Sequence, residues 1–224
     1  MRTRTNVLLP GVVLLLGAVA VAPAQKQGPP SQVDLPKWLA AGKLRAVNRE
    51  ITKVPDTPDG VHMSERQDPG VVWLTGVDFG EGEIRVEVRG RDRFQQSFLG
   101  IAFHGKDDQT YEAVYLRPFN FRAQDPVRHR HALQYMAVPE FDWPRLREQF
   151  PDEFERPVSP SLEPTGWVTL RVAVQERNVQ VYVGPDQMPV LTARKLGNLN
   201  RGMVGLWTGN GSDGDFANLR ITSK

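Results

Sequence analysis

The amino-acid sequence predicts an all-β domain in which two antiparallel sheets pack as a sandwich. Short segments that alternate apolar and polar residues recur along the chain, and clusters of Pro, Gly, Asn and Asp separate them at short intervals. Neither heptads nor a helical repeat is visible. Many short strands with frequent turns are typical of two packed sheets. Because no composition shift interrupts this pattern, we expect one domain over residues 44–224.

The start of the chain has the pattern of a leader. Two early arginines precede the apolar run 7–20, and the tripeptide Ala22-Pro23-Ala24 offers a small-residue cleavage site. This predicts a signal peptide over residues 1–24 and an exported protein, periplasmic or secreted. A membrane anchor is the alternative, but the apolar run is short for a span of about 20 residues. A flexible lead-in is expected over residues 25–43.

Charge and cysteine content narrow the classes of partner. The chain has 28 basic and 26 acidic residues, and the expected leader contains two of the basic ones and no acidic one. The mature chain would therefore be neutral, whereas a nucleic-acid binder usually carries a basic excess. We expect no nucleic-acid partner and no membrane span after cleavage. Since the chain has no Cys, neither disulfides nor an acylated cysteine contribute.

The first half of the domain reads as a series of strands. Residues 44–54 form the first, and the turn cluster PDTPDG follows at 55–60. Residues 83–89 form the clearest strand, because three aliphatic residues alternate with charged ones. The next strand, within 94–104, contains Gly100, where neighbouring backbones can approach closely.

One short helix interrupts the strands near residues 142–150. Asp142 can cap its first turn, Pro144 suits that turn, and Pro151 ends it. We expect this helix at a sheet edge or groove rim. Strands resume over 167–174 and 179–183, joined as a hairpin, and continue to residue 222. The loop NGSDGD at 210–215 reads as another hairpin turn.

Three stretches carry a resemblance to known families. WVTLRVAVQERNVQVYV at 167–183 and GMVGLWTGNGSDGDFANLRI at 202–221 resemble strands of laminin-G-like and concanavalin A-like jelly rolls. Residues 97–103 with Tyr111-Glu112 are similar to the middle strands of bacterial 3-keto-disaccharide hydrolase domains. The resemblance covers about residues 71–221. It implies a jelly-roll sandwich, a ligand across the concave sheet or its rim loops, and hydrolysis of a glycosidic bond.

The most informative stretch for function is residues 109–135, where two strands flank a loop that contains Pro, Asn, Asp and several arginines. Aromatic rings stack on sugar faces, and guanidinium and amide groups bind hydroxyls. We therefore predict a carbohydrate-binding groove. Its expected substrate-binding residues are Tyr111, Tyr115, Arg117, Asn120, Arg130, Gln134, Tyr135, Trp143, Arg147 and Trp207.

The strand period of two sorts these residues between two faces. It places Tyr111, Tyr115 and Arg117 on one face and Glu112 on the other, unless a bulge intervenes. It likewise separates Gln134 from Tyr135. A structural ion pair between Glu112 and Arg117 is an alternative role for those two residues.

Glycoside hydrolysis usually requires two carboxylates about 5–9.5 Å apart. Glu112 and Glu155 are the candidate catalytic residues. The alternative function is a non-catalytic, laminin-G-like module for binding or protein interaction.

No metal or cofactor is expected. His129 and His131 would share one face if they lay on a strand, and two histidines on one face could bind Zn²⁺. This is a weak argument, because no third ligand is apparent. Asp213 and Asp215 give a similarly weak case for Ca²⁺.

Overall fold

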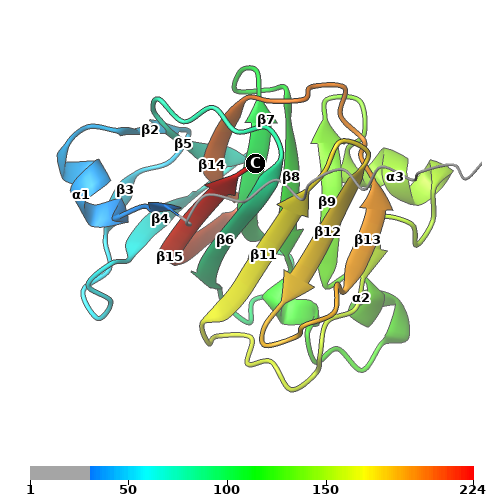
Figure 1. Cartoon of the computed structure of the whole chain (residues 1–224). Helices are drawn as coiled ribbons and strands as arrows, with labels where there is room; N and C mark the ends of the chain where they lie inside the picture. Colours follow the sequence, from blue (N-terminus) through cyan, green and yellow to red (C-terminus); the bar gives the residue numbers. More distant parts are fainter. Residues whose placement is uncertain (1–30) are drawn as a thin grey trace, which may run out of the picture.

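The computed structural model describes residues 31–224, which form an antiparallel sandwich of two sheets (Figure 1). Sheet A has eight strands over these residues: β13 (Leu191–Arg194), β12 (Asn178–Val183), β11 (Val168–Val174), β6 (Gly82–Arg89), β15 (Ser212–Ser223), β4 (Val61–Arg66) and β3 (Ile51–Lys53), with β1 (Ser31–Gln32) beside β15. Sheet B has seven: β10 (Glu155–Arg156), β9 (Leu133–Val138), β8 (Tyr111–Leu116), β7 (Leu99–Gly105), β14 (Met203–Thr208), β5 (Gly70–Leu74) and β2 (Leu44–Val47). The predicted all-β jelly-roll sandwich is confirmed.

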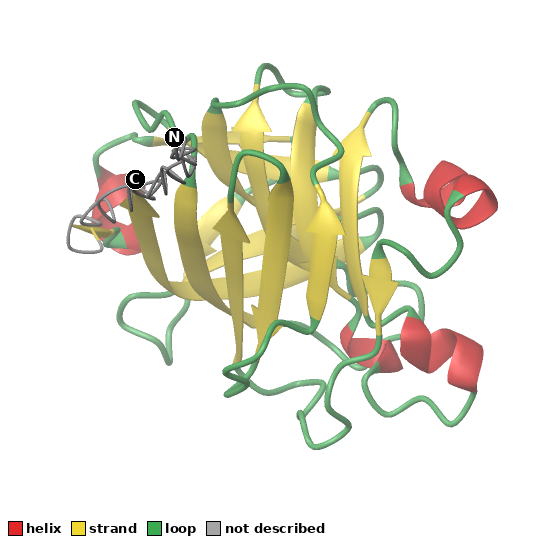
Figure 2. Cartoon of the chain, turned by 45° about the vertical axis from the view of Figure 1, so that its right-hand side comes forward, coloured by secondary structure: helices red, strands yellow, loops and turns green. Residues whose placement is uncertain are grey.

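The helices lie at the ends of the sandwich, as Figures 1 and 2 show. They are α1 (Leu35–Ala40), α2 (Pro126–Arg130) and α3 (Trp143–Gln149), with the 3₁₀ turn η1 (Pro118–Asn120). The helix expected near 142–150 is α3, and the Asp142 side chain caps it by accepting from the Arg145 N–H at 3.1 Å. The loop expected between β8 and β9 instead contains α2, so the second strand begins at Leu133 and not at His131.

Residues 31–43 belong to the folded domain. β1 pairs with β15, and Val33 and Leu35 are buried in the core. The flexible lead-in expected over 25–43 is therefore wrong for its described part, because these apolar side chains anchor it. The expected signal peptide lies outside the described residues. None of the helices in residues 31–224 is long and apolar enough to cross a membrane.

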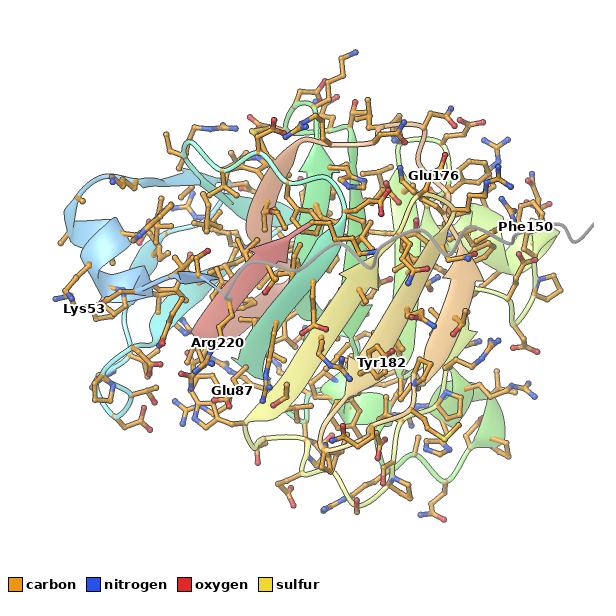
Figure 3. All side chains as sticks on the ribbon, viewed as in Figure 1. Lys53, Glu87, Phe150, Glu176, Tyr182 and Arg220 are labelled. Atoms are coloured by element: carbon orange, nitrogen blue, oxygen red, sulfur yellow. The ribbon has the colours of Figure 1, made fainter. Side chains whose placement is uncertain are left out.

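The hydrophobic core lies between the two sheets. It forms because apolar and polar residues alternate along the strands. In β6, β11 and β12 the aliphatic residues are buried and their neighbours are partly or fully exposed, as the period of two predicts. Figure 3 labels Glu87, Tyr182 and Arg220 among the side chains on the outer face of sheet A. That face is polar and paired: the Arg171 guanidinium lies 3.6 Å from the Tyr182 ring centroid and 3.0 Å from the Glu83 carboxylate.

Gly100 allows the close strand packing that the sequence predicted. It lies in β7 between Trp207 of β14 and Tyr115 of β8, and a Cβ built on it would meet the Val114 carbonyl oxygen at 2.0 Å. Substitution Gly100→Ala must therefore push two strands apart. We expect it to lower the free energy of unfolding by about 1–3 kcal/mol, measured by urea denaturation. Gly76→Ala is not a suitable control, because Gly76 has a positive φ and alanine would be strained there for a different reason. An unchanged denaturation midpoint would show that the strands do not pack this closely.

The turn at 210–215 has a different role from the one expected. It was predicted to close a hairpin, but β14 belongs to sheet B and β15 to sheet A. The chain therefore crosses from one sheet to the other at Asn210 and Gly211, where Gly211 adopts φ +62°. A composition rich in Gly and Asp predicts a tight turn but not which strands it joins.

Candidate functional site

A groove of about 600 Å³ lies on the face of sheet B that points away from sheet A. We call it the sheet B groove. Seven of the residues predicted for substrate binding line it: Tyr111, Tyr115, Arg117, Asn120, Trp143, Arg147 and Trp207. Loops and helices complete the walls with Pro69, Phe94, Gln95, Phe98, Phe119, Arg128, His131, Asp142, Gly209 and Asn210, and β9 adds Met136 and Val138.

The floor of the groove is aromatic because of the strand register. Tyr115 and Trp207 lie in register on either side of Gly100, and with no side chain between them their ring centroids are 4.7 Å apart. The Trp207 Nε1–H donates to the Tyr111 hydroxyl at 3.1 Å. Burial raises the pKa of Tyr111 and of Tyr115, so both phenols keep their protons and remain able to donate.

Small residues in the next row make room for a large ring on the same face of sheet B. In the next row, Ala113 of β8 pairs with Ala102 of β7, which in turn pairs with Gly205 of β14. These three residues share the face of Tyr115 and Trp207, since they lie two positions away along each strand or its bulged equivalent. A Cβ on Gly205 would meet the Trp73 ring at 2.9 Å, so Trp73 covers this row and packs edge-to-face on Tyr111 with centroids 5.8 Å apart.

Two exposed aromatic side chains stand at the rim. Trp143, the first residue of α3, is 47% exposed, and Phe94, in the loop before β7, is 56% exposed. Each carries an arginine on its ring: Arg147 lies 4.9 Å from the Trp143 centroid and Arg128 lies 4.4 Å from that of Phe94. Trp143 and Arg147, one helical turn apart, therefore lie on the same face of α3, and the Trp143 ring stays open to the groove.

A buried ion cluster holds the arginines of one wall. Glu155 in β10 accepts from Arg117 at 3.0 Å and from Arg147 at 2.9 and 2.7 Å. Arg117 also donates to the Tyr115 hydroxyl at 2.9 Å and to the Gln134 side-chain oxygen at 3.1 Å. Glu155 is therefore a positioning group that orients Arg117 and Arg147. Gln134, fully buried, accepts from Arg117 on the same face as Tyr115 and does not line the groove.

Glu112 and Tyr135 lie on the opposite face of sheet B. Glu112 is 2% exposed, with its Oε1 atom 2.8 Å from His104 Nδ1. The Tyr135 hydroxyl donates to Glu112 and accepts from the Leu196 N–H at 2.9 Å. The prediction of Tyr135 as a substrate-binding residue is therefore wrong, as is the alternative pairing of Glu112 with Arg117.

The same geometry corrects the catalytic pair. Glu155 is in register with Gln134 and so with Tyr115, three positions from Glu112, which places the two carboxylates on opposite faces of the sheet. They do not flank a common bond. Arg130, another predicted binding residue, is also outside the groove: it is exposed, with its Nε 3.6 Å from the Asp152 carboxylate.

Sequence reasoning missed Arg49, which lies behind one end of the groove. This side chain is 6% exposed and donates to Thr208 Oγ1 at 2.7 Å and to the carbonyl oxygens of Gly209 and Asp68 at 2.8 and 2.9 Å. Burial lowers its pKa to about 10. No periodic pattern marks it, because Arg49 lies between two strands.

The aromatic wall was missed as well. Phe98 packs edge-to-face on Phe119 with centroids 5.4 Å apart, and Phe94 does the same at 5.6 Å. The expected strand within 94–104 begins only at Leu99, so Phe94 and Phe98 lie in the loop before it and reach Phe119 of η1.

The candidate metal residues are arranged differently from expectation. His129 lies in α2 and His131 caps its end, so they do not share a strand face, and His129 Nε2 lies 3.1 Å from the Val158 carbonyl oxygen. Asp213 and Asp215 border a second, polar hollow of about 470 Å³, where Asp213 pairs with Arg91 and Asp215 with Arg89. Within residues 31–224 no three His, Cys, Asp or Glu side chains converge as metal ligands.

His62 makes this second hollow sensitive to pH. Its Nδ1 lies 2.7 Å from Asp215 Oδ1, and this hydrogen bond raises the pKa of His62 above 6.5. The stabilisation is complete below about pH 6.5 and is lost as pH rises through the raised pKa. We expect the wild-type Tm to fall between about pH 6.5 and 8.5 by more than that of His62→Gln, measured by differential scanning calorimetry. Parallel pH profiles would contradict this role for His62.

Comparison with solved structures identifies the fold. The chain superposes on carbohydrate-binding module CBM66 from Bacillus subtilis with a TM-score of 0.57 at 10% identity, over 80% of this chain and 95% of that one. It superposes on a Bacillus subtilis protein of unknown function with a galectin-like fold with a TM-score of 0.59 at 13% identity, over 89% and 99%. The chain has the concanavalin A-like jelly-roll fold.

A third similar structure is the carbohydrate recognition domain of Emp46p in its metal-free form, with a TM-score of 0.52 at 11% identity over 84% of this chain and 90% of that one. At these identities the similarity shows the jelly-roll fold alone. No protein-family model and no curated protein matches the sequence.

Proposed function

We propose that this jelly-roll domain binds a carbohydrate in the sheet B groove. The observation that carries the proposal is the floor of Tyr115 and Trp207, 4.7 Å apart, between two exposed aromatic rims. The exposed Trp143 and Phe94 rings match the C–H faces of a sugar, the almost fully buried Tyr115 and Trp207 form an apolar floor between them, and the polar groups of the lining match its hydroxyls. The carbohydrate-binding proteins among the similar structures agree with this proposal but do not specify a sugar.

The contacts of the acidic residues near the groove support binding of a saccharide better than its hydrolysis. Asp142, the acidic residue that lines the groove, accepts from the Arg145 N–H as a helix cap. Glu155 is 4% exposed, accepts hydrogen bonds from Arg117 and Arg147, and does not line the groove, so it is not placed beside a glycosidic bond as a glycosidase requires. A binding module needs neither carboxylate to exchange a proton.

A glycan array followed by calorimetry tests the proposal. We expect wild-type protein to retain a subset of oligosaccharides and to leave them intact after prolonged incubation, as judged by chromatography. Retention of none would overturn saccharide binding, and cleavage of a retained glycan would overturn the assignment as a binding module.

We further propose that the protein acts outside the cytoplasm, on the basis of the leader pattern at residues 1–24. Expression of the full chain in a bacterial host is expected to yield a product in the periplasm or medium, shortened at the Ala22-Pro23-Ala24 site. Mass spectrometry of the N-terminus measures this directly, and an uncleaved cytoplasmic product would contradict it.

A further inference from the structure

The sheet B groove has more positive charge around it than its own carboxylates neutralise. Arg117, Arg128 and Arg147 line the groove, and Arg49 lies behind one end of it. Glu155 pairs with both Arg117 and Arg147. By contrast, no carboxylate of the described residues lies within 4.0 Å of the Arg49 or Arg128 guanidinium. Neither Arg49 nor Arg128 therefore makes an ion pair, although Asp68 and Asp125 act on them at longer range and Asp142 adds one carboxylate to the lining.

Arg128 is held in place with donors to spare. Its guanidinium lies on the Phe94 ring, and it donates to the Phe119 carbonyl oxygen at 3.2 Å and to Asn120 Oδ1 at 3.4 Å. Those bonds use Nε and one hydrogen of Nη2, so that Nη1 has no bond to the described residues. A guanidinium carries five N–H groups in a planar fork. Arg128 thus has donors left for a ligand, and its side chain borders both the sheet B groove and a smaller hollow of about 310 Å³ beside α2.

Arg49 adds to the positive electrostatic potential of the groove from the end opposite Arg128. It is buried among neutral oxygens, and its neighbour Thr208 belongs to the strand that carries Trp207. A cation removed from water without a carboxylate is costly unless a counter-charge approaches. An anion in the groove would meet both this potential and the free donors of Arg128.

We infer that the sheet B groove takes an acidic saccharide, and that the carboxylate of a uronate residue binds the Arg128 guanidinium. This inference rests on the proposed carbohydrate-binding function and specifies its ligand class. The planar fork matches a carboxylate in a way that it does not match a single hydroxyl, and the charge strengthens each hydrogen bond. The sugar ring lies on the Tyr115 and Trp207 floor while its acidic group faces Arg128.

The wild-type protein provides the first test. α-1,4-linked trigalacturonate and its methyl ester differ in charge but share one backbone, so calorimetry on the pair isolates the carboxylate. We expect the acid to bind at least about tenfold more tightly than the ester at low ionic strength. This ratio should shrink as salt is added, because mobile ions screen partly exposed charges. Equal affinities, or a preference for the ester, would overturn the inference.

Two arginines of α2 provide a matched pair of variants. Arg128→Met keeps an unbranched side chain over Phe94 and removes the charge, whereas Arg130→Met removes a charge that faces Asp152 outside the groove. We expect Arg128→Met to abolish the preference for the acid over the ester and Arg130→Met to retain it. Retention of the preference by Arg128→Met would overturn the assignment to this residue.

The outcomes separate the two proposals. If wild-type protein binds neutral oligosaccharides in the groove and shows no preference for trigalacturonate, the acidic ligand class fails and carbohydrate binding stands. If neither neutral nor acidic oligosaccharides bind, both proposals fail.

Discussion

Replacing Glu112 with alanine is expected to lower the free energy of unfolding by about 3–5 kcal/mol, because it removes one partner of a buried charged cluster. His104 is 1% exposed and its ring nitrogens face two acceptors, Glu112 Oε1 at 2.8 Å and the Gly80 carbonyl oxygen at 2.8 Å. The carbonyl can only accept, so Nε2 donates to it and Nδ1 faces the carboxylate. Without Glu112, His104 and the Tyr135 hydroxyl lose their buried partner.

Equilibrium denaturation in urea measures this effect, with Glu83→Ala as the matched control. Glu83 also pairs across strands, with Arg171, but its side chain is 34% exposed on the outer face of sheet A. An exposed pair contributes about 0–1 kcal/mol, so the control should be nearly neutral. A Glu112→Ala variant as stable as Glu83→Ala would contradict the role of Glu112 as the buried partner of His104 and Tyr135.

Replacing Trp143 with alanine is expected to weaken saccharide binding by about 30-fold, the loss that corresponds to an aromatic contact of about 2 kcal/mol. The ring lies at the rim of the sheet B groove and is 47% exposed, and the fold does not depend on it for core packing. Its removal also leaves Arg147 without the ring that it covers at 4.9 Å. Stability should change little, because exposed side chains contribute little to unfolding.

Calorimetry with the tightest oligosaccharide from the array measures this loss, and Trp167→Ala serves as the control. Trp167 lies under Arg89 at 4.7 Å, near the start of β11 in sheet A, and does not line the groove. Its removal should leave affinity within about twofold of wild type. Equal losses from the two tryptophans would mean that the sugar does not lie in the sheet B groove.

The sheets were largely predictable because one face of each strand is buried. The alternation in β6, β11 and β12 follows from the core on one side and water on the other, and the structure has the same pattern. Helix α2 was not predictable in this way, since five residues are too few for a period of 3.6. Its start signals, Asp125 and Pro126, were nevertheless present.

The candidate site was predictable only in part. Period two correctly placed Tyr115 and Arg117 on one face and Glu112 on the other, because no bulge interrupts β8. Periodicity cannot say which of two polar faces is open. That depends on His104, the partner of Glu112, which follows Phe103, the residue in register with Glu112, and adopts φ +48°. A local sequence pattern does not predict the register between strands, and so it does not predict such contacts.

Nuclear magnetic resonance of the tryptophan side chains tests the central claim most directly, since the chain has five indole N–H reporters. Two of them, Trp143 and Trp207, line the sheet B groove, whereas Trp38 and Trp167 do not. On titration with a bound oligosaccharide we predict that the signals of Trp143 and Trp207 shift and those of Trp38 and Trp167 stay in place. Shifts confined to Trp38 or Trp167, with Trp143 and Trp207 unmoved, would contradict it.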